Sequence, residues 1–252
     1  MLLSDLTWPE IKKLTPDTPV IVPVAATEQH GPHMPVFTDS LLLGEIVRRA
    51  HDVLASRVLL TPLLWLGNSD HHMDHAGTLS ARPRVYLDLL NGLIDDLIQH
   101  GFRRILIING HGGNDVPGKQ AVFEARQRYR SRSDLLLLFA TYWVLAEEPH
   151  RCHPDLQQTR MGHACEWETS MMLRLRPELV HNHTTTPAIP FGKPFEPASR
   201  GWIMPDRSPP GHVGDPTIAT PEKGEALFAL FSAGLIAMVE RILAWDGSSW
   251  DG

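Results

Sequence analysis

The feature that most constrains the fold is the alternation of apolar runs with amphipathic segments along the first 140 residues. Apolar runs of this length predict strands of a sheet that helices cover on both faces, because such strands are buried throughout. The expected strands are 20–24, about 58–61, 104–108 and 135–140. The expected helices between them are about 40–55, 83–100 and 116–131. Strands that alternate with helices in this way are typical of a parallel sheet, so we predict an α/β fold.

The second half of the chain is less regular. One helix is expected from about His163 to Leu175, and a last helix from Glu222 to about Trp245. Between them, residues 182–221 are rich in proline and glycine yet contain Trp and Phe. We therefore expect an ordered excursion over the surface or onto a neighbouring subunit. Since 252 residues can bury one sizeable core, we predict a single domain over 1–252.

Composition argues against several classes of protein. The net charge of -6 offers no basic surface for a phosphate backbone, so no nucleic-acid partner is expected. The uninterrupted apolar runs are far shorter than the ~20 residues that cross a bilayer, so we expect a soluble protein without a membrane partner. Two cysteines and no apolar leader after Met1 favour a reducing cytoplasm. The 14 histidines, by contrast, are clustered and exceed what packing needs.

Two of the apolar runs end in segments rich in potential metal ligands. Glu28, His30 and Asp39 follow the run at 20–24, and His111 follows the run at 104–108 among three glycines. Because ligands bind outside the carboxyl ends of the strands in open α/β sheets, both segments are expected at one edge. The second segment alone is also explained as a glycine-rich turn that happens to contain a histidine. The presence of both segments favours a functional site.

A third group stands at the start of the helix predicted from His163. Residues three apart on a helix share a face, so His163 and Glu166 are expected to point at one site, with Glu168 rotated away. An acid in a first helical turn is also explained by the helix dipole alone. Oxygen and nitrogen donors without sulfur suit zinc, manganese or iron, and three carboxylates suit two ions, with Asp39 between them. The predicted metal ligands are Glu28, His30, Asp39, His111 and Glu166.

Another cluster of acids and histidines occupies residues 70–75. Consecutive residues of an extended segment face opposite ways, so these histidines are not expected to share one ion. A substrate-contacting loop and a solvated polar turn explain the cluster equally well, and a separate structural zinc is a third interpretation. The aromatic residues are most simply core or interface residues, although one of them could wall the substrate pocket. The predicted substrate-contacting residues are His72, His75, Thr78 and Trp143.

Together these motifs resemble those of the creatininase family, the metal-dependent creatinine amidohydrolases and their relatives. The matching segments, in the same order along the chain, are 24–33, 38–39, 77–78, 109–114, 163–170 and 211–216. The resemblance implies a three-layer α/β/α fold with a mostly parallel central sheet and two divalent metal ions per subunit. It also implies hydrolysis of C–N amide bonds and a homo-oligomer such as a hexamer. By position, it implies metal ligation by Glu28, His30, Asp39 and His111, and a catalytic role for His163.

Two departures from creatininase itself bear on specificity. Where creatininase has a Tyr and a metal-binding Glu after the histidine of the second motif, this chain has Gly112 and Gly113, so Glu166 is expected to supply the missing ligand. The Trp that precedes the catalytic histidine by four residues in creatininase is Thr159 here, and the Phe-Pro before Gly-Thr has become His75-Ala76. Creatinine is therefore not the expected substrate.

These observations predict a metal-dependent amidohydrolase that cleaves a C–N amide bond in a small molecule, such as a cyclic amide or a formamide. A hydroxide between the two ions would attack the carbonyl, His163 would pass a proton to the departing nitrogen, and Glu168 would orient His163 or a ligand. One alternative is a peptidase that trims a modified precursor peptide. Another is a non-catalytic metal-binding or sensing protein of the same fold.

Overall fold

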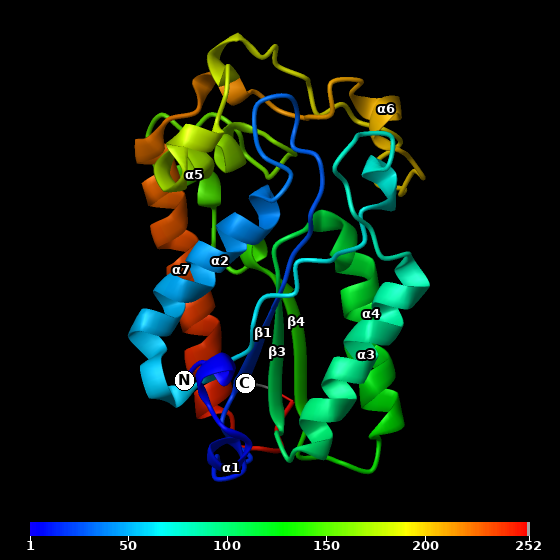
Figure 1. Ribbon diagram of the computed structural model, residues 1–252, viewed down its shortest axis with the longest axis vertical. Helices are drawn as coiled ribbons and strands as arrows, with labels where there is room; N and C mark the ends of the chain where they lie inside the picture. The colour runs from blue at the N-terminus through cyan, green and yellow to red at the C-terminus, as the bar shows by residue number, and fades with distance from the viewer. Residues whose placement is uncertain (251–252) are drawn as a thin grey trace.

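A four-stranded parallel sheet forms the centre of the computed structural model, which describes residues 1–250 (Figure 1). The strand order is β2-β1-β3-β4. β1 (Val20–Val24) and β3 (Arg104–Asn109) are the inner strands, and β2 (Leu59–Leu60) and β4 (Leu136–Thr141) are the outer ones. All four predicted strands are confirmed within two residues at each end. The inner strands are entirely buried, which explains why their sequences are apolar rather than alternating.

The register of the sheet brings the ends of three strands level. Val24 pairs with Asn109 across β1 and β3, and Asn109 pairs with Thr141 across β3 and β4. The strands are parallel, so the segments that follow these residues leave the sheet at the same edge. The residues that the sequence placed after β1 and β3 therefore meet in space, as open parallel sheets require of their ligand-binding loops.

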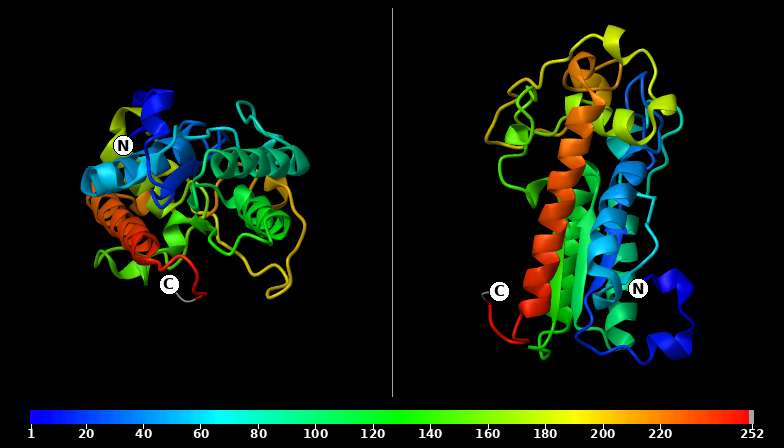
Figure 2. Two further views of the ribbon diagram at one scale, coloured as in Figure 1. Left: turned by 90° about the horizontal axis from the view of Figure 1, so that it is seen from below. Right: turned by 90° about the vertical axis from the view of Figure 1, so that its left-hand side faces the viewer.

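Helices cover both faces of the sheet (Figures 1 and 2). On one face lie α2 (Thr38–Leu54), α5 (Glu166–Leu175) and α7 (Pro221–Ala244), and on the other lie α3 (Pro83–Gln99) and α4 (Asp115–Arg128). Successive strand residues point to opposite faces. Leu106 and Ile108 accordingly pack under α2 and α7, and Ile105 and Ile107 pack under α3 and α4. Each such buried side chain contributes ~1.5–3 kcal/mol of transfer free energy. The predicted three-layer α/β/α fold is confirmed.

Helix α7 is long and apolar enough to span a membrane, with a mean hydropathy of 1.9 over its most apolar window. Its charged residues stand near its two ends, and Ser232 and Gly234 interrupt the apolar stretch between them, so the search for uninterrupted apolar runs missed it. In the structure, Leu227, Phe231 and Leu235 of α7 are fully buried in the core against α2 and α5. Packing inside the protein thus accounts for part of its apolar character, since 39% of that window is buried.

Helix α5 begins at Glu166, so the prediction that it begins at His163 was wrong. Two residues before it are not helical: Ala164 has a left-handed φ of 50°, and Cys165 is extended. His163 instead pairs with Val213 through two backbone hydrogen bonds, of 3.0 and 2.7 Å. The chain thus turns sharply between this pairing and the helix, and His163 and the acids of α5 do not lie on one helical surface.

The excursion over residues 182–221 crosses the carboxyl edge of the sheet, at the top of Figure 1. It contains the short helix α6 (Met204–Arg207) and two single 3-10 turns, His183–Thr185 and Pro216–Ile218. Backbone hydrogen bonds between Ile189 and Gly214 join the two ends of this segment. Part of the excursion therefore covers the place where the predicted site residues lie.

Candidate metal centre

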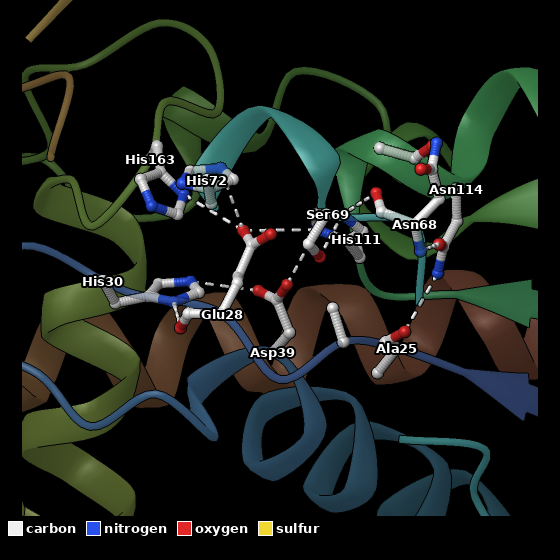
Figure 3. Close-up of polar contacts among 12 residues, drawn as sticks. Ala25, Glu28, His30, Asp39, Asn68, Ser69, His72, His111, Asn114 and His163 are labelled. Carbon is white, nitrogen blue, oxygen red and sulfur yellow. Dashed lines mark hydrogen bonds and ion pairs between the residues drawn. The ribbon is translucent and has the colours of Figure 1, made fainter. Parts of the chain in front are cut away.

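Four predicted ligands converge at the carboxyl edge of the sheet (Figure 3). Glu28 and His30 lie in the loop after β1, Asp39 lies in the first turn of α2, and His111 follows β3. Their exposed fractions are 1%, 0%, 4% and 3%, respectively. The structure therefore brings together, out of water, side chains that come from separate segments, as the strand ends predicted.

Asp39 lies between the two histidines and directs one oxygen to each. Its Oδ1 is 3.1 Å from His30 Nε2, and its Oδ2 is 2.9 Å from His111 Nδ1. Glu28 Oε1 lies 3.3 Å from His111 Nδ1. A carboxylate that faces two imidazoles with its two oxygens is a suitable candidate metal ligand.

The remaining ring nitrogen of each histidine is held by the backbone. His30 Nδ1 lies 3.1 Å from the carbonyl oxygen of Glu28, and His111 Nε2 lies 3.0 Å from that of Asn68. The side chain of Asn109 holds His111 further, because it accepts a hydrogen bond from the His111 backbone N–H and donates one to its carbonyl. These contacts aim the opposite nitrogen of each ring at the carboxylates, as supporting hydrogen bonds do in metal sites.

Of the two acids of α5, Glu168 reaches the cluster and Glu166 does not. Glu168 Oε1 lies 3.8 Å from His30 Nε2, and Glu168 Oε2 accepts a hydrogen bond from the backbone N–H of Ala164. Glu166 Oε1 instead lies 2.7 Å from Lys223 Nζ on α7, and its Oε2 accepts hydrogen bonds from two backbone amides of the preceding loop. The expectation that Glu166 points at the site was wrong, because it assumed that His163 belongs to the same helix.

Gly113 cannot be replaced by a residue with a side chain without moving the loop around it. A β-carbon there would lie 2.1 Å from the Asn68 carbonyl oxygen and 2.5 Å from His111 Nε2, whereas one at Gly112 would meet nothing within 4 Å. No acidic side chain can therefore project from position 113 in this backbone. A carboxylate for the second half of the cluster has to come from elsewhere, and Glu168 is in reach.

The segment 70–72 is a 3-10 turn, so the assumption of an extended conformation was wrong. His71 and His72 lie side by side, with their ring centroids 4.2 Å apart. His72 Nε2 is 3.4 Å from Glu28 Oε1, and ligand atoms of His71, Glu28 and His111 all lie within 4.8 Å of one another. Both histidines therefore border the cluster. The sequence analysis assigned no role to His71, because a 3-10 turn leaves no periodic signal in so short a segment.

The other predicted substrate-contacting residues separate into two groups. Trp143 lines the cavity above the cluster together with His72. Thr78 instead accepts a hydrogen bond of 3.2 Å from the backbone of Gln29, and His75 Nε2 lies 3.2 Å from the carbonyl oxygen of Pro209. Thr78 and His75 do not line that cavity among the described residues. Their contacts support the loops around it.

His163 lies at the wall of the cavity, beside the cluster. Its Nδ1 is 3.6 Å from Glu28 Oε1, and its Nε2 is 2.8 Å from the carbonyl oxygen of Gln29. The Gln29 side chain contacts His72 Nδ1 at 2.7 Å and donates to the carbonyl oxygen of Gly211 at 2.7 Å. Gln29 thus ties together three segments of the site. The sequence analysis gave it no role, because an amide side chain is not a metal ligand of this class.

In the cluster, the negative charges of the carboxylates favour protonation of the neighbouring histidines, and the protonated histidines in turn keep the carboxylates ionised. Burial opposes protonation of His111, but Glu28 and Asp39 outweigh it and raise the pKa of His111 to about 10. His30 follows the same pattern: burial opposes protonation, whereas Asp39 and Glu168 raise its pKa well above the usual value. Burial also opposes ionisation of Asp39, yet His30 and His111 lower its pKa.

This charge balance suits divalent cations. Burial raises the pKa of Glu168, because its contacts with His30 and with the Ala164 backbone N–H offset the loss of water only in part. The side-chain atom Glu28 Oε2 is buried without a hydrogen-bond donor among residues 1–250. Buried carboxylate oxygens normally have a partner, and a metal ion is one that this donor set fits. An ion would replace the protons on the histidines, since a ligating imidazole is neutral.

A cavity of about 680 Å³ opens directly onto the cluster. Its floor is formed by Glu28, Asp39, His111 and Glu168. Its walls include Trp143 from the end of β4 and residues of the excursion, among them Phe191 and Trp202. A volume in the range of small-molecule sites, with polar groups at one end and aromatic residues around them, is typical of a binding pocket for an organic substrate.

The fold and the site define an α/β/α protein with a metal-ligand cluster at the carboxyl edge of a parallel sheet. The family model described as creatininase, creatinine amidohydrolase, matches residues 4–239. The chain therefore belongs to the creatininase family of hydrolases, and the resemblance drawn from its motifs is confirmed.

Individual relatives agree over most of the chain. The creatinine amidohydrolase of Pseudomonas putida is 27% identical over 93% of this chain and 94% of its own. The mycofactocin precursor peptide peptidase of Mycolicibacterium smegmatis is 31% identical over 90% of this chain and 85% of its own. Among solved structures, one described as creatininase with Mn has a TM-score of 0.81 at 26% identity and covers 95% of this chain and 97% of that one. The family thus holds members with different substrates.

Proposed function

We propose that this protein is a metal-dependent amidohydrolase that cleaves a C–N amide bond in a small molecule, such as a cyclic amide or a formamide. The observation that carries the proposal is the placement of Asp39 between His30 and His111 at the floor of a cavity whose wall contains His163. Ligands and a proton carrier thus face one enclosed space. A protein that only stored or sensed metal would not need the cavity or the histidine at its wall.

The ligands divide into two sets that share Asp39. Glu28, Asp39 and His111 form one set, and His30, Asp39 and Glu168 form the other, with His71 and His72 at the margin. The donor atoms are oxygen and nitrogen only, which fits zinc, manganese or iron. When bound, two such ions would polarise the substrate carbonyl and make water a nucleophile at neutral pH.

His163 is placed to move a proton. Burial, followed by the nearby His30 and His72, lowers the pKa of His163 well below the usual value, so its ring is neutral at pH 7. Its Nε2 points at the carbonyl oxygen of Gln29, which assigns the ring proton to Nε2 and leaves Nδ1 as an acceptor. Nδ1 can therefore take up a proton from the attacking water and return it to the departing nitrogen.

Cleavage of a peptide is the second candidate function. The 31% identity to a precursor peptide peptidase favours it, as does a second hollow of about 360 Å³ that adjoins the cavity and shares Phe191 and Trp202 with it. We place small amides first, because the excursion covers the cluster and restricts the space above it. Creatinine is not proposed as the substrate, because Thr159 and His75-Ala76 replace the Trp and the Phe-Pro of creatininase.

Metal analysis and a substrate panel test the proposed function. We expect untreated protein to contain two divalent ions per chain and to hydrolyse a member of a panel of cyclic amides, formamides and short peptides, with activity lost on chelation and regained with metal. His163→Ala should lower kcat by about 10²–10⁴-fold at unchanged metal content, as loss of a general acid–base does. Loss of metal in this variant would make His163 a ligand. Metal-loaded protein that hydrolyses nothing in the panel would favour the sensing alternative.

We further propose a cytoplasmic homo-oligomer, such as a hexamer. Exposed apolar residues on α3 and α4 support this proposal: Val85, Val116 and Phe123 are 59%, 76% and 60% exposed, respectively. Groups of exposed apolar side chains mark protein–protein contacts, and these three lie on the two helices that cover one face of the sheet. Sedimentation equilibrium of the full chain measures the subunit number, and a monomer at micromolar concentration would contradict the proposal.

A further inference from the structure

Two arginines stand at the mouth of the metal cavity. Arg200 and Arg207 both come from the excursion over 182–221, and both line the metal cavity and the adjoining hollow. The other charged side chains that line the metal cavity are carboxylates, namely Glu28, Asp39 and Glu168, apart from the histidines. The only permanent positive charges on the described lining of this cavity therefore come from two exposed residues of the excursion.

Neither arginine is neutralised within the part of the chain that the structure describes. No carboxylate lies within 4 Å of Arg200 or Arg207 among residues 1–250, whereas Arg160, the other arginine that lines the adjoining hollow, contacts one. Of the two acids that line the adjoining hollow, Glu196 pairs with Arg160 at 3.4 Å, and Asp206 accepts the backbone N–H of Ile203 at the start of α6. In a protein of net charge -6, two unpaired arginines at one cavity are notable.

Arg207 is held in place by an aromatic ring rather than by an acid. Its guanidinium lies over the ring of Trp202 at 4.7 Å, and Trp202 in turn contacts the ring of His71 at 4.8 Å between centroids. Stacking of this kind orients a guanidinium and leaves its N–H donors free. Because His71 borders the cluster, Arg207 is separated from the cluster by the rings of Trp202 and His71, which meet edge to face. This arrangement places positive charge beyond the reacting end of the cavity.

The charge at this position is uncompensated. Although much of the Arg207 side chain is exposed, partial removal from water lowers the pKa of its guanidinium, and the like charge of Arg160 lowers it further. A nearby carboxylate would have the opposite effect. The surroundings of Arg207 therefore favour the arrival of an anion.

We infer that Arg200 and Arg207 form a subsite for an oxyanion of the substrate, a carboxylate or a phosphate group, at the end of the molecule away from the amide that is cleaved. The inference rests on the proposed amidohydrolase function and narrows its substrate class to acidic amides. The planar fork of a guanidinium matches both carboxylate and phosphate oxygens. An acidic substrate would bind with this group at the mouth and its amide at the floor.

Matched substrates and variants test the subsite. The substrates are two pairs of formamides: N-formyl-β-alanine with its neutral amide, and N-formylethanolamine phosphate with N-formylethanolamine. The variant is R200Q/R207Q in the metal-loaded protein. The control is R130Q/R241Q, which removes two exposed arginines at the opposite edge of the sheet.

We expect one acidic substrate to exceed its neutral partner by at least about tenfold in kcat/KM, through a lower KM, since hydrogen bonds to charged groups contribute this much. The R200Q/R207Q variant should lower kcat/KM for the acidic member about tenfold more than for the neutral one, and the control should change neither. The pair that shows the preference distinguishes carboxylate from phosphate. Equal loss on both members of each pair, or no preference in the natural protein, would overturn the inference.

A binding measurement separates failure of the subsite from failure of the proposed function. If no formamide is hydrolysed, calorimetric titration of the metal-loaded protein with glutarate and with inorganic phosphate decides the matter. The subsite predicts binding of one of them that weakens at least about tenfold in R200Q/R207Q and is unchanged in R130Q/R241Q. Binding of equal strength in R200Q/R207Q would place the anion on the metal ions, and absence of binding would remove the subsite altogether.

Discussion

The floor and the cover of the cavity are built in different ways. The floor residues Glu28, Asp39 and His111 are at most 4% exposed, and each lies beside a strand end or a helix start. The cover comes from the irregular segment 182–221, where Trp202 is only partly buried and Arg200 is exposed. The comparison suggests that the sheet holds the reacting groups and that the excursion chooses the substrate.

The two regions also differ in how many contacts hold each side chain. His111 is fixed by Asn109, Asn68 and two carboxylates, whereas Arg207 has one ring contact. Substitutions in a densely bonded site disturb several groups at once, and substitutions in an open loop disturb few. Related proteins can thus keep one chemistry and exchange substrates by changing the cover, which agrees with the different activities of the relatives.

The largest effect is expected from Asp39→Asn, at the centre of the floor. Both ligand sets share this carboxylate, so the variant should lose most of its metal, and kcat/KM should fall by roughly a thousandfold or more, since metal ions supply several kcal/mol of transition-state stabilisation. Metal content per chain and kcat/KM on the best panel substrate measure the effect. A variant with two ions and near-normal turnover would break the assignment of Asp39 as the shared ligand.

The two acids of α5 allow a sharper comparison, because substitution of one should affect metal binding and substitution of the other should affect stability. Glu168→Gln should weaken metal binding and lower activity by about 10- to 100-fold with little change in stability. Glu166→Gln removes the counter-charge of the buried Lys223, which keeps only neutral partners such as the Ile218 carbonyl oxygen, and should lower the free energy of unfolding by about 3–5 kcal/mol. Urea unfolding and metal titration of both variants give the four values. If Glu166→Gln weakened metal binding and Glu168→Gln lowered stability instead, Glu166 would be the metal ligand.

The glycines after His111 form a matched pair within the floor. Gly113→Ala places a β-carbon 2.1 Å from the Asn68 carbonyl oxygen and should lower the free energy of unfolding by about 1–3 kcal/mol, with weaker metal binding because His111 must move. Gly112→Ala meets nothing within 4 Å and should be close to neutral. Thermal unfolding with metal titration compares the two. If both variants had the same stability and metal affinity, the backbone after His111 would be able to move, and this part of the floor would not be rigid.

The smallest effect is expected from Trp202→Ala in the cover. The variant removes the ring on which Arg207 stacks, so KM for the preferred substrate should rise about three- to tenfold, with kcat and metal content nearly unchanged. Trp8→Ala in the short helix α1 (Trp8–Ile11) is the control: Trp8 is 74% exposed and does not line the cavity, so this variant should leave KM unchanged. A large fall in kcat for Trp202→Ala would mean that this residue takes part in the reaction, and that the cover does not act on substrate binding alone.

The regular part of the molecule was predictable, because period and composition carry that information locally. The buried runs 20–24 and 104–108 became β1 and β3, and the helices between the strands followed from their apolar stripes. The meeting of Glu28, Asp39 and His111 also followed, since parallel strands deliver their ends to one edge. These inferences needed no knowledge of distant contacts.

Where the prediction failed, a local rule was applied beyond its range. The i, i+3 rule linked His163 to Glu166 only if both were helical, and the left-handed Ala164 breaks that link. The alternation rule separated His71 from His72 only if the segment was extended, and it is a 3-10 turn. In both cases the backbone conformation is set by packing against distant segments, as the pairing of His163 with Val213 illustrates.

By itself, the sequence determined the α/β/α layers and most of the buried cluster of carboxylates and histidines, because hydrophobic periodicity and strand polarity act over a few neighbouring residues. Only the tertiary structure decided that Glu168 rather than Glu166 faces His30, and that Arg200 and Arg207 lie at the cavity mouth. The long excursion has no period to read, and its position depends on contacts between residues far apart in the chain.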